Sequence, residues 1–287
     1  METIVSQMLK RYNATTTGEM KNALKEVLQE LILYILSKSD FFNYAAFYGG
    51  TALRIFYNLD RFSEDLDFSL KYPNKSFDLK HYIELIQKEL TAFGISVIAE
   101  VKTKSKDSHI LSAFLKSNTQ EHIITLYSPS SIHGIHPDEL LKIKIEVDTD
   151  PPKNALFENH YRLLPAPFDV CVFDIASLFA GKIHAILCRT WKNRIKGRDL
   201  YDFIFFLSIN APVNLSHLKS RLVQTNYIAE NDLFTLPILK EMLIKKFSDI
   251  DYKQAKEDVK PFIKDVFSLS LWSDDFFIKL LNQLKEK

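Results

Sequence analysis

A short apolar strand, a pair of glycines and a helix follow one another at residues 44–57, and this order constrains the fold most. Residues 44–48 are apolar, Gly49 and Gly50 interrupt them, and residues 51–57 have a helical pattern. Glycines let backbone N–H groups approach a ligand closely, and a helix N-terminus attracts anions. Because any tight strand-to-helix turn has the same pattern, phosphate binding here depends on further residues.

Two aspartates follow in the next alternating segment. Residues 65–71 alternate, with Asp65 and Asp67 on one face of a predicted strand and apolar side chains on the other. Strand residues i and i+2 point to the same side, so both carboxylates project together. Adjacent carboxylates repel unless a cation separates them, and oxygen ligands suit Mg²⁺. The alternative interpretation is a solvent-facing edge strand.

The strongest alternation falls at residues 141–148, and the polar face of this predicted strand carries Glu146 and Asp148. A third carboxylate from a neighbouring strand would complete a two-metal site for nucleotidyl displacement. Either residue could supply it, because both lie on the same strand face. A glycine pair, an aspartate pair and a later strand carboxylate, in this order, resemble the polymerase-β-type nucleotidyltransferase core.

Four motifs in order resemble those of the AbiEii/AbiGii nucleotidyltransferase toxins. The motif segments are GGTALR at 49–54 with RFSEDLDF at 61–68, KIE at 144–146, DIASLFAGK at 174–182 and RDLYD at 198–202. The similarity covers about residues 44–205, and no motif of the family follows residue 210.

The resemblance implies an enzyme of the EC 2.7.7 class that acts as a toxin in a bacterial type IV toxin–antitoxin or abortive-infection system. Such a toxin would transfer nucleotides from an NTP to RNA, with tRNA the favoured acceptor, and inhibit growth or translation. A cognate antitoxin would be encoded nearby. The alternatives are nucleotidylation of a protein or small molecule, and a catalytically silent module that binds NTP or RNA.

The resemblance also implies roles for individual residues. The metal ligands would be Asp65, Asp67 and Glu146, with Asp148 as the alternative to Glu146; the ion would be Mg²⁺, with Mn²⁺ as the alternative. The nucleotide-binding residues would be Gly49, Gly50, Thr51, Ser63 and Lys182. The catalytic residues would be Asp65, Asp67, Glu146, Lys182 and Asp199.

Lys182 and the two aspartates of the last motif also have structural interpretations. Lys182 could be a solvated helix lysine, although apolar residues surround it in the sequence. A flexible ammonium could instead meet the triphosphate. Asp199 and Asp202 are three residues apart on a predicted helix, where capping and ion pairing are ordinary roles. We expect such a structural role for Asp202.

Residues 189–198 are basic, contain no acidic side chain and include Trp191. Such a segment can bind an RNA backbone through charge and stacking, or form a solvated helix end. The candidate RNA-binding residues are Arg189, Lys192, Arg194 and Lys196.

Composition excludes several classes of protein. A net charge of +1 excludes a wholly basic nucleic-acid coat, and a hydrophobic content of 46% excludes a disordered chain. No apolar run approaches the roughly 18 residues of a membrane span, so no membrane partner is expected. The N-terminal residues lack a signal-peptide core. Two cysteines, Cys171 and Cys188, argue against a disulfide scaffold. We therefore expect a cytoplasmic protein.

The predicted fold class is α+β: a polymerase-β-type nucleotidyltransferase core, with a mixed sheet and flanking helices, plus a helical C-terminal region. The predicted domains are a core with an N-terminal helix at 1–150 and a mainly helical domain at 151–287 that completes the active-site cleft. The other predicted helices lie at 18–38, begun by a capping box of Thr16 and Glu19, and at 76–93. The other predicted strands lie at 95–103, 109–116 and 122–127.

Overall fold

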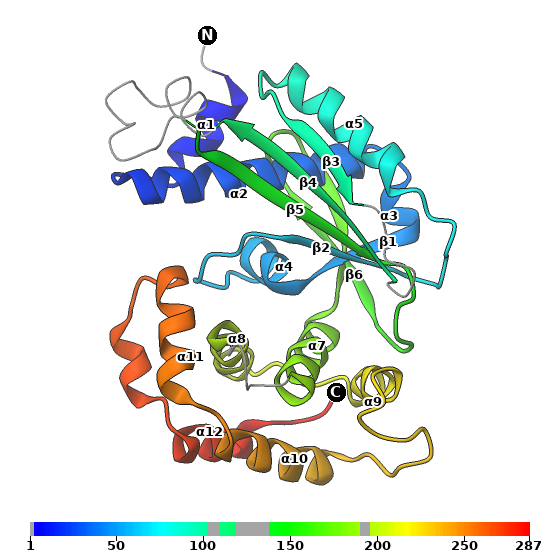
Figure 1. The fold of residues 1–287 in the computed structure, drawn as a ribbon, viewed down its shortest axis with the longest axis vertical. Coiled ribbons are helices and arrows are strands. Elements are labelled where there is room, and N and C mark those ends of the chain that lie inside the picture. The colour runs from blue at the N-terminus through cyan, green and yellow to red at the C-terminus, as the bar shows by residue number, and fades with distance from the viewer. Residues whose placement is uncertain (1–2, 103–108, 119–137, 190–195) are drawn as a thin grey trace. The chain divides into compact units, whose positions relative to one another are not determined.

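The computed structural model describes residues 3–102, 109–118, 138–189 and 196–287 (Figure 1). The chain divides into two compact units. The sheet unit consists of Met1–Phe56, Glu64–Pro151 and Asn159–Val172, and the helical unit consists of Tyr57–Ser63, Pro152–Glu158 and Phe173–Lys287.

The described residues form a seven-stranded sheet in the order β3-β4-β5-β2-β1-β7-β6. Its strands are β1 (Ala45–Tyr48), β2 (Leu66–Leu70), β3 (Ile98–Lys102), β4 (Ile110–Asn118), β5 (Leu140–Asp148), β6 (Phe157–Arg162) and β7 (Phe168–Phe173). Strand β2 pairs antiparallel with β1 and parallel with β5, so the sheet is mixed. The mixed sheet and the helices around it confirm the predicted α+β class.

Alternation gives the centre of the sheet one apolar and one polar face. In β5, the apolar side chains from Leu141 to Val147 are buried, whereas the charged residues between them are exposed or half-buried. Strand β2 follows the same rule, with Leu66 and Phe68 on the buried face and Asp67 on the other. Successive strand residues point to opposite faces, so Asp67 of β2 and Glu146 and Asp148 of β5 lie on the polar face.

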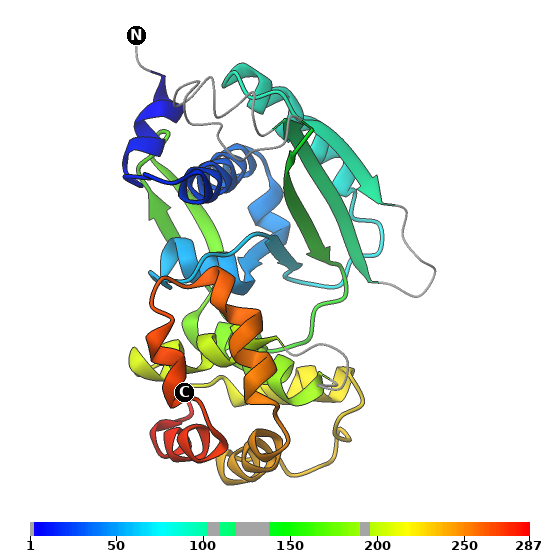
Figure 2. The ribbon, with the colours of Figure 1, turned by 60° about the vertical axis from the view of Figure 1, so that its left-hand side comes forward.

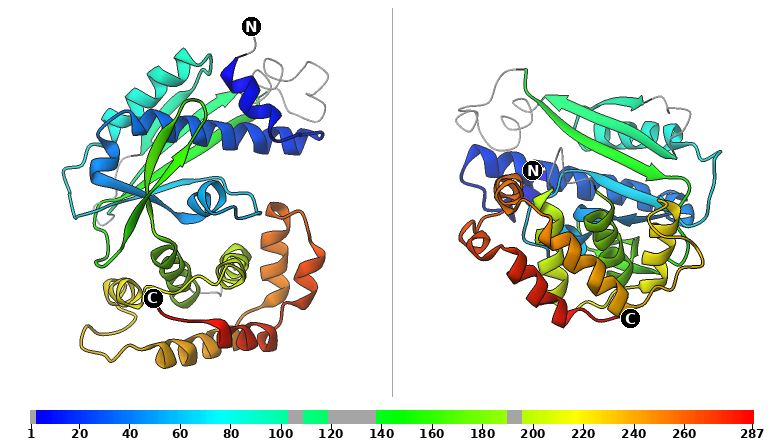
Figure 3. Two further views of the ribbon diagram at one scale, coloured as in Figure 1. Left: turned by 180° about the vertical axis from the view of Figure 1, so that it is seen from behind. Right: turned by 60° about the horizontal axis from the view of Figure 1, so that its bottom comes forward.

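Helices α2 and α5 cover the apolar face of the sheet. The helices of the sheet unit are α1 (Ile4–Lys10), α2 (Thr17–Ser37), α3 (Phe41–Tyr44), α4 (Gly49–Phe56) and α5 (Leu79–Ala92). Figure 3 (left) shows α2 crossing the strands. Leu28 of α2 and Leu90 of α5 line a small internal cavity together with Leu115 of β4 and Ile143 of β5. This packing leaves the polar face for other contacts.

Helix α2 begins at the predicted capping box. The Thr16 hydroxyl accepts a hydrogen bond from Glu19 N at 3.2 Å, and the Glu19 carboxylate accepts one from Thr16 N at 3.1 Å. Backbone hydrogen bonds to this carboxylate, from Thr15 and Thr16, lower the pKa of Glu19 to about 2. The box satisfies donors that the first helical turn leaves unpaired.

Helices form most of the second unit (Figure 2). They are α7 (Ile175–Cys188), α8 (Gly197–Ser208), α9 (Leu215–Gln224), α10 (Leu236–Ser248), α11 (Tyr252–Val259), η2 (Lys260–Phe262), η3 (Phe267–Leu271), α12 (Asp274–Leu280) and η4 (Leu281–Gln283). Buried aromatic side chains fill its core: Phe179 of α7 stacks on Phe206 of α8 with ring centroids 4.4 Å apart. The predicted helical C-terminal region is confirmed.

Four elements have no counterpart in the sequence prediction: α1, α3, β6 and β7. Strand β7 is buried along most of its length, so it lacks the alternation that identifies a half-buried strand. Strand β6 ends the sheet, and its residues, FENHYR, show no buried apolar face. The strand predicted at 122–127 lies outside the described residues.

Candidate functional site

The turn between β1 and α4 carries Gly49 against the carboxylate of Asp67. Gly49 has φ of +83°, in the left-handed region that favours glycine. A Cβ at this position would overlap Asp67 Oδ2 and would lie 3.1 Å from Asp67 Cβ. Any side chain here would therefore displace the Asp67 carboxylate. The sequence Gly49-Gly50 thus lets the start of α4 approach Asp67 closely.

Strand register places Glu146 directly beside Asp67. The two residues are partners on the adjacent parallel strands β5 and β2, and Ser69 is the partner of Asp148. Neighbouring strands lie about 4.8 Å apart, whereas two residues along a strand span about 6.6 Å. Glu146 is therefore nearer to Asp67 along the sheet than Asp148 is. In addition, Asp148 Oδ1 accepts a hydrogen bond from Asp150 N at 3.0 Å.

Two neighbours hold the Glu146 carboxylate on the polar face. Lys144 Nζ lies 2.8 Å from Glu146 Oε1, and Ser112 of β4 donates a hydrogen bond to the same oxygen at 3.0 Å. Ser112 is the register partner of Glu146 on β4. The sequence pattern gave Ser112 no role, because only the sheet pairing brings it beside this carboxylate.

Asp65 and Thr51 link α4 to the start of β2. Asp65 is exposed and directly precedes β2. Thr51 is buried, and its hydroxyl donates a hydrogen bond to the Asp65 carbonyl. Helix α4 therefore contacts both aspartates: Thr51 bonds to the backbone of Asp65, and Gly49 lies against the side chain of Asp67. Gly50 is buried in the first turn of α4.

Helix α2 fixes the residue before Asp65. Glu64 receives an ion pair from Lys25 Nζ at 2.8 Å, and its carbonyl accepts a hydrogen bond from Gln29 Nε2 at 2.9 Å. Helix α2 also holds α4, since Arg54 Nε donates to Glu26 Oε1 at 3.0 Å. Burial raises the pKa of Glu26, although Arg54 opposes this effect. These supporting residues were not identified from sequence.

The donor set of the sheet unit suits a hard cation. Within the described ranges, no three aspartate, glutamate, histidine or cysteine side chains are grouped as a metal site. Mg²⁺ commonly uses one or two carboxylates and takes its other ligands from water and substrate phosphates. Asp65 and Asp67 could supply that share, and the absence of a side chain at Gly49 lets the Asp67 carboxylate lie against the start of α4.

In the helical unit, Lys182 of α7 lies against two aspartates of α8. Lys182 Nζ is 2.7 Å from Asp202 Oδ2 and 3.4 Å from Asp199 Oδ1. The Lys182 side chain is 16% exposed, whereas Asp202 is fully buried. The helical unit therefore brings Lys182 and Asp199, two expected catalytic residues, into one cluster of ion pairs.

Arg61 supplies the second positive charge of this cluster. Its Nε and Nη2 donate to Asp202 Oδ1 and Oδ2, both at 2.6 Å, and its side chain is 2% exposed. Such a bidentate pair is among the stronger protein hydrogen bonds. Burial alone would raise the pKa of Asp202, but the charges of Arg61 and Lys182 outweigh it and hold that pKa below its usual range.

Arg61 has no role predicted from the sequence, and Asp202 was expected to have only a structural one. The available signal was that each is a charged residue within one of the quoted motifs. Asp202 is an interior residue of α8 that pairs with two cations. The ion pairs of Asp202 agree with the structural role expected for it. Neither Asp199 nor Asp202 caps the helix, because the N-cap residue of α8 is Lys196.

Arg189 joins the same cluster. Its Nη1 lies 2.5 Å from Asp199 Oδ2, so this candidate RNA-binding residue is ion-paired within the helical unit. We call these five residues the α7–α8 cluster: Arg61, Lys182, Arg189, Asp199 and Asp202. Lys196 directly precedes α8. The other candidates, Lys192 and Arg194, lie outside the described residues, as does Trp191.

Ser63 belongs to a short segment of the helical unit, Tyr57–Ser63. The Ser63 side chain is buried. Phe62 N donates to Phe262 O at 2.8 Å, and Arg61 Nη1 donates to Phe62 O at 2.9 Å. These bonds fix the backbone that carries Ser63 within its own unit.

Cys171 and Cys188 are both free thiols. Burial raises the pKa of Cys188, which disfavours the nucleophilic thiolate. In the described part of the chain, no helix is both long enough and apolar enough to span a bilayer.

Comparisons with known proteins give one family and several similar solved structures, two of which are described here. Residues 31–279 match the family model described as nucleotidyl transferase AbiEii toxin, type IV toxin–antitoxin system. The crystal structure of JHP933 from Helicobacter pylori is 17% identical, covers 91% of this chain and 90% of its own, and gives a TM-score of 0.48. A proposed nucleotidyltransferase from H. pylori is 18% identical, with coverages of 90% and 92% and a TM-score of 0.47. No curated protein matches the chain.

Proposed function

Because the chain belongs to the nucleotidyl transferase AbiEii toxin family of type IV toxin–antitoxin systems, we propose that it transfers nucleotides from an NTP to RNA, with tRNA the favoured acceptor. Membership makes it a nucleotidyltransferase of a toxin–antitoxin system, for which a cognate antitoxin is expected. The choice of NTP as donor and RNA as acceptor is the proposal.

One observation carries this proposal: the polar face of the sheet places Asp67 between Gly49 and Glu146. Gly49 leaves no side chain beside Asp67, and Glu146 is its register partner on β5. Nucleotidyl transfer requires neutralisation of triphosphate charge and alignment of an attacking oxygen, mainly by electrostatics and positioning. Clustered carboxylates beside a glycine-lined helix start can serve both requirements.

Asp65 and Asp67 would hold Mg²⁺ in this proposal, and Glu146 would be the third carboxylate. When bound, the ion would supply positive charge to the triphosphate and a template for the reacting oxygens. Gly49 and Gly50 would present backbone N–H groups to phosphate oxygens. We propose Glu146 rather than Asp148 for the third position because of its register with Asp67.

The α7–α8 cluster would provide the second set of charges. Arg61 keeps Asp202 paired through two hydrogen bonds of its own. Lys182 can therefore turn its ammonium toward a phosphate oxygen without leaving Asp202 an unpaired buried charge. Asp199 lies within 3.4 Å of the same ammonium and would orient it.

The direct test is transfer of label from radioactive NTPs to total RNA in the presence of Mg²⁺. We expect the wild-type protein to label RNA and Asp67→Ala to lose that activity. Glu146→Gln should lose at least about 10²-fold, the size typical of a lost electrostatic contact at a reacting centre. The matched control is Asp148→Asn, two residues along the same strand face, which should retain most activity.

Other outcomes would overturn parts of the proposal. Equal labelling by wild type and Asp67→Ala would mean that the assigned metal site is wrong. Label on protein or small-molecule acceptors, with RNA untouched, would exclude RNA as the acceptor. NTP binding without transfer would indicate a catalytically silent module. A larger loss for Asp148→Asn than for Glu146→Gln would exchange the roles of these two carboxylates.

A further inference from the structure

Strand β6 is an edge of the sheet. Among the described strands it pairs only with β7, because the strand order ends at β6. An edge strand offers a row of backbone N–H and C=O groups to an added strand, and proteins often block such edges with lysine or proline. The residues of β6, FENHYR, include neither. This edge is therefore suited to pairing with another strand.

One face of β6 is apolar and exposed. Tyr161 and Leu163, which directly follows the strand, are each 75% exposed. Phe157 lies on the same face and is 37% exposed, although its ring contacts Phe173 with centroids 5.2 Å apart. Asn159 lies between Phe157 and Tyr161. The described residues thus leave much of this apolar surface uncovered.

The opposite face carries an acidic and a basic residue on either side of a histidine. Glu158, His160 and Arg162 alternate with the residues of the apolar face. The Glu158 carboxylate accepts a hydrogen bond from the Tyr57 hydroxyl, and Arg162 Nη2 lies 2.9 Å from Glu30 Oε2. These contacts hold the two charged side chains two residues from His160 in opposite directions along the strand.

An antiparallel copy of β6 would complement this order of charges. Pairing about a two-fold axis perpendicular to the sheet keeps every residue on its own face, so a residue, and not a peptide bond, lies on the axis. With His160 on the axis, Glu158 of each copy lies opposite Arg162 of the other. Opposite charges at directly opposite positions stabilise a strand pair.

The same register matches the apolar face. Phe157 lies opposite Leu163 of the second copy, and Asn159 lies opposite Tyr161. Each copy would thus cover the exposed leucine and tyrosine of the other. No other residue on the axis places Glu158 opposite Arg162, so charge and apolar contacts specify one register.

We propose that the β6 edge joins two copies of this chain in an antiparallel, two-fold symmetric dimer with His160 at the axis. Self-complementarity identifies the occupant as a second copy, because an isologous interface must match its own surface. Strand β6 has six residues, fewer than the roughly 20–30 a side of a standard interface. The dimer should therefore form only as the protein concentration rises. It does not depend on the proposed function.

Analytical ultracentrifugation of the full chain, without NTP, RNA or metal, measures this association. We expect the wild type to pass from monomer to dimer as its concentration rises. Tyr161→Lys/Leu163→Lys introduces the residue that natural proteins use to block edges. It should raise the dissociation constant by at least about tenfold, because both copies lose their apolar cross-strand contacts. The melting temperature of the diluted protein should stay near that of wild type, since both side chains are exposed.

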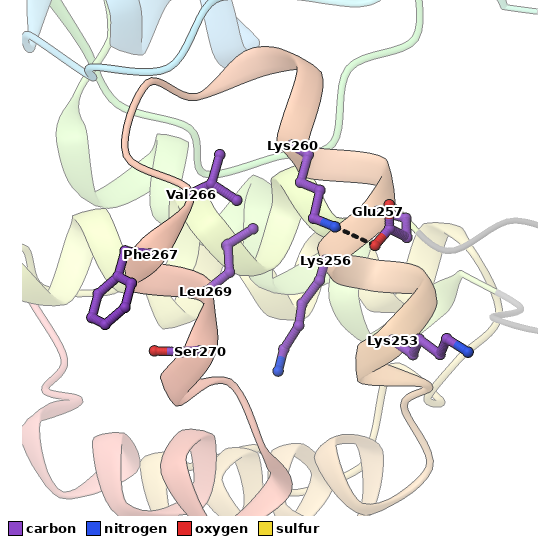
Figure 4. Close-up of a pocket in the computed structure, with 8 residues that line it drawn as sticks. All are labelled: Lys253, Lys256, Glu257, Lys260, Val266, Phe267, Leu269 and Ser270. Atoms are coloured by element: carbon purple, nitrogen blue, oxygen red, sulfur yellow. Dashed lines mark hydrogen bonds and ion pairs between the residues drawn. The ribbon is translucent and has the colours of Figure 1, made fainter.

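The matched control is Phe267→Lys/Leu271→Lys. It replaces an aromatic residue and a leucine of η3 that are 86% and 64% exposed. Figure 4 shows the Phe267 ring directed away from α11, on the outer side of η3. The control makes the same kind of change on a different surface and should dimerise like wild type.

Disulfide trapping tests the register. Directly opposite residues of an antiparallel pair have Cα atoms about 4.5–5.5 Å apart, within the range of a disulfide. His160→Cys should therefore form a disulfide-linked dimer on mild oxidation. Asn159→Cys and Tyr161→Cys should each fail alone, because the two copies of either position would lie about 8 Å apart, but should link to each other when mixed. Wild type, with Cys171 and Cys188, reports crosslinking through the native thiols.

Four outcomes would overturn the dimer. The first is a wild-type protein that stays monomeric at every concentration. The second is a dimer that persists in Tyr161→Lys/Leu163→Lys, since its interface would lie elsewhere. The third is equal dissociation of the β6 and η3 lysine variants, which would indicate general apolar association. The fourth is disulfide formation by Asn159→Cys or Tyr161→Cys alone without His160→Cys, which would contradict the register. Labelling of RNA by a strictly monomeric protein would support the proposed function and refute the dimer.

Discussion

At the scale of single residues, the α7–α8 cluster balances the charge of a buried aspartate. Two cations, Arg61 and Lys182, contact the fully buried Asp202, and Asp199 contacts Lys182. A buried charge is costly unless it is paired, so this balance explains how Asp202 can lie inside the helical core. Arg61 makes the bidentate contact with Asp202. Lys182 is therefore the cation that can leave Asp202 for another partner without leaving the aspartate unpaired.

Lys182→Ala should lower transfer more than it lowers stability. Removing the ammonium from a developing phosphate charge should cost at least about 10²-fold in rate. Asp202 would lose one charged hydrogen bond but keep Arg61, so the free energy of unfolding should fall by about 1.5–3 kcal/mol. Lys182→Arg should restore little activity, because a planar guanidinium replaces a compact ammonium poorly. Labelling rates and thermal melting measure the two effects separately.

Asp202→Asn is the matched comparison. It leaves the Lys182 ammonium in place but removes the charge that compensates the buried Arg61, at a cost of about 3–5 kcal/mol of stability. We expect Asp202→Asn to be less stable than Lys182→Ala yet more active where both are folded. If activity instead follows stability in both variants, Lys182 is a structural residue.

The contacts of this cluster could not be read from the sequence. Arg61 and Asp202 are separated by 141 positions, and the residues around each of them do not indicate that the two side chains are partners. Sequence motifs indicated Lys182 and Asp199 because resemblance to a family attached roles to them. Side-chain pairing across such a separation depends on the packing of segment 57–63 against α8, which hydrophobic periodicity does not specify.

At the scale of helices and strands, hydrophobic periodicity predicts some features and misses others. Alternation predicted β2 and β5 and the face that carries Asp67 and Glu146. Asp65, which was expected on the same strand face as Asp67, lies just before β2. It could not predict that β2 and β5 are parallel neighbours or that Asp67 is the partner of Glu146, because alternation defines faces and not partners. It also missed β7, whose burial hides the two-residue period. The strand face of the candidate metal ligands could thus be predicted from the sequence, but the register that makes Glu146 the partner of Asp67 could not.

Gly197→Ala should destabilise the helical unit. Gly197 begins α8, and an added Cβ would overlap Ala255 O of α11 and lie 2.7 Å from Ala255 C. A backbone neighbour cannot turn away as a side chain can, so α8 and α11 would have to separate. Overpacking of this kind costs typically about 1–3 kcal/mol or more. Thermal melting should therefore show a lower midpoint.

The control is Gly181→Ala within α7. A Cβ there would meet no atom within 4 Å, and alanine is the better helix former, so this variant should gain about 0.5–1 kcal/mol. Opposite shifts in the two melting curves are expected. A Gly197→Ala protein as stable as wild type would mean that α8 and α11 are less closely packed than described.

At the scale of the whole molecule, one motif contributes to two units. Ser63 belongs to the helical unit and Asp65 to the sheet unit, although a single residue separates them in the chain. The sheet unit carries the candidate metal ligands, and the helical unit carries Lys182 and Asp199. Sequence predicted the α+β class and a helical C-terminal region because periods of two and of 3.6 residues dominate different parts of the chain. The assignment of 57–63 and 152–158 to the helical unit depends on long-range contacts that such periods do not contain.

Two histidines of the helical unit, His184 and His217, should make the stability of this unit depend on pH. We expect the free energy of unfolding to fall below about pH 6.5. Burial lowers the pKa of His217 to about 4 and that of His184 to about 3. His217 Nδ1 lies 2.8 Å from Lys153 O, while its buried Nε2 has no partner among the described residues, so a second proton would be an unpaired buried charge. An unfolded histidine takes up its proton near pH 6.5. The unfolded state therefore binds more protons between pH 6.5 and 4, and acidification favours unfolding.

The measurement is the free energy of unfolding in denaturant from pH 7.5 to 4.5, a range set about the ordinary histidine pKa of about 6.5. Each histidine should contribute a slope of up to about 1.4 kcal/mol per pH unit below its unfolded pKa. His184→Gln/His217→Gln should flatten this part of the profile, because glutamine does not titrate and can still donate to a carbonyl. The control His81→Gln removes an exposed histidine of α5 and should leave the slope unchanged. An unaltered slope in the double variant would mean that carboxylates, and not these histidines, cause the acid sensitivity.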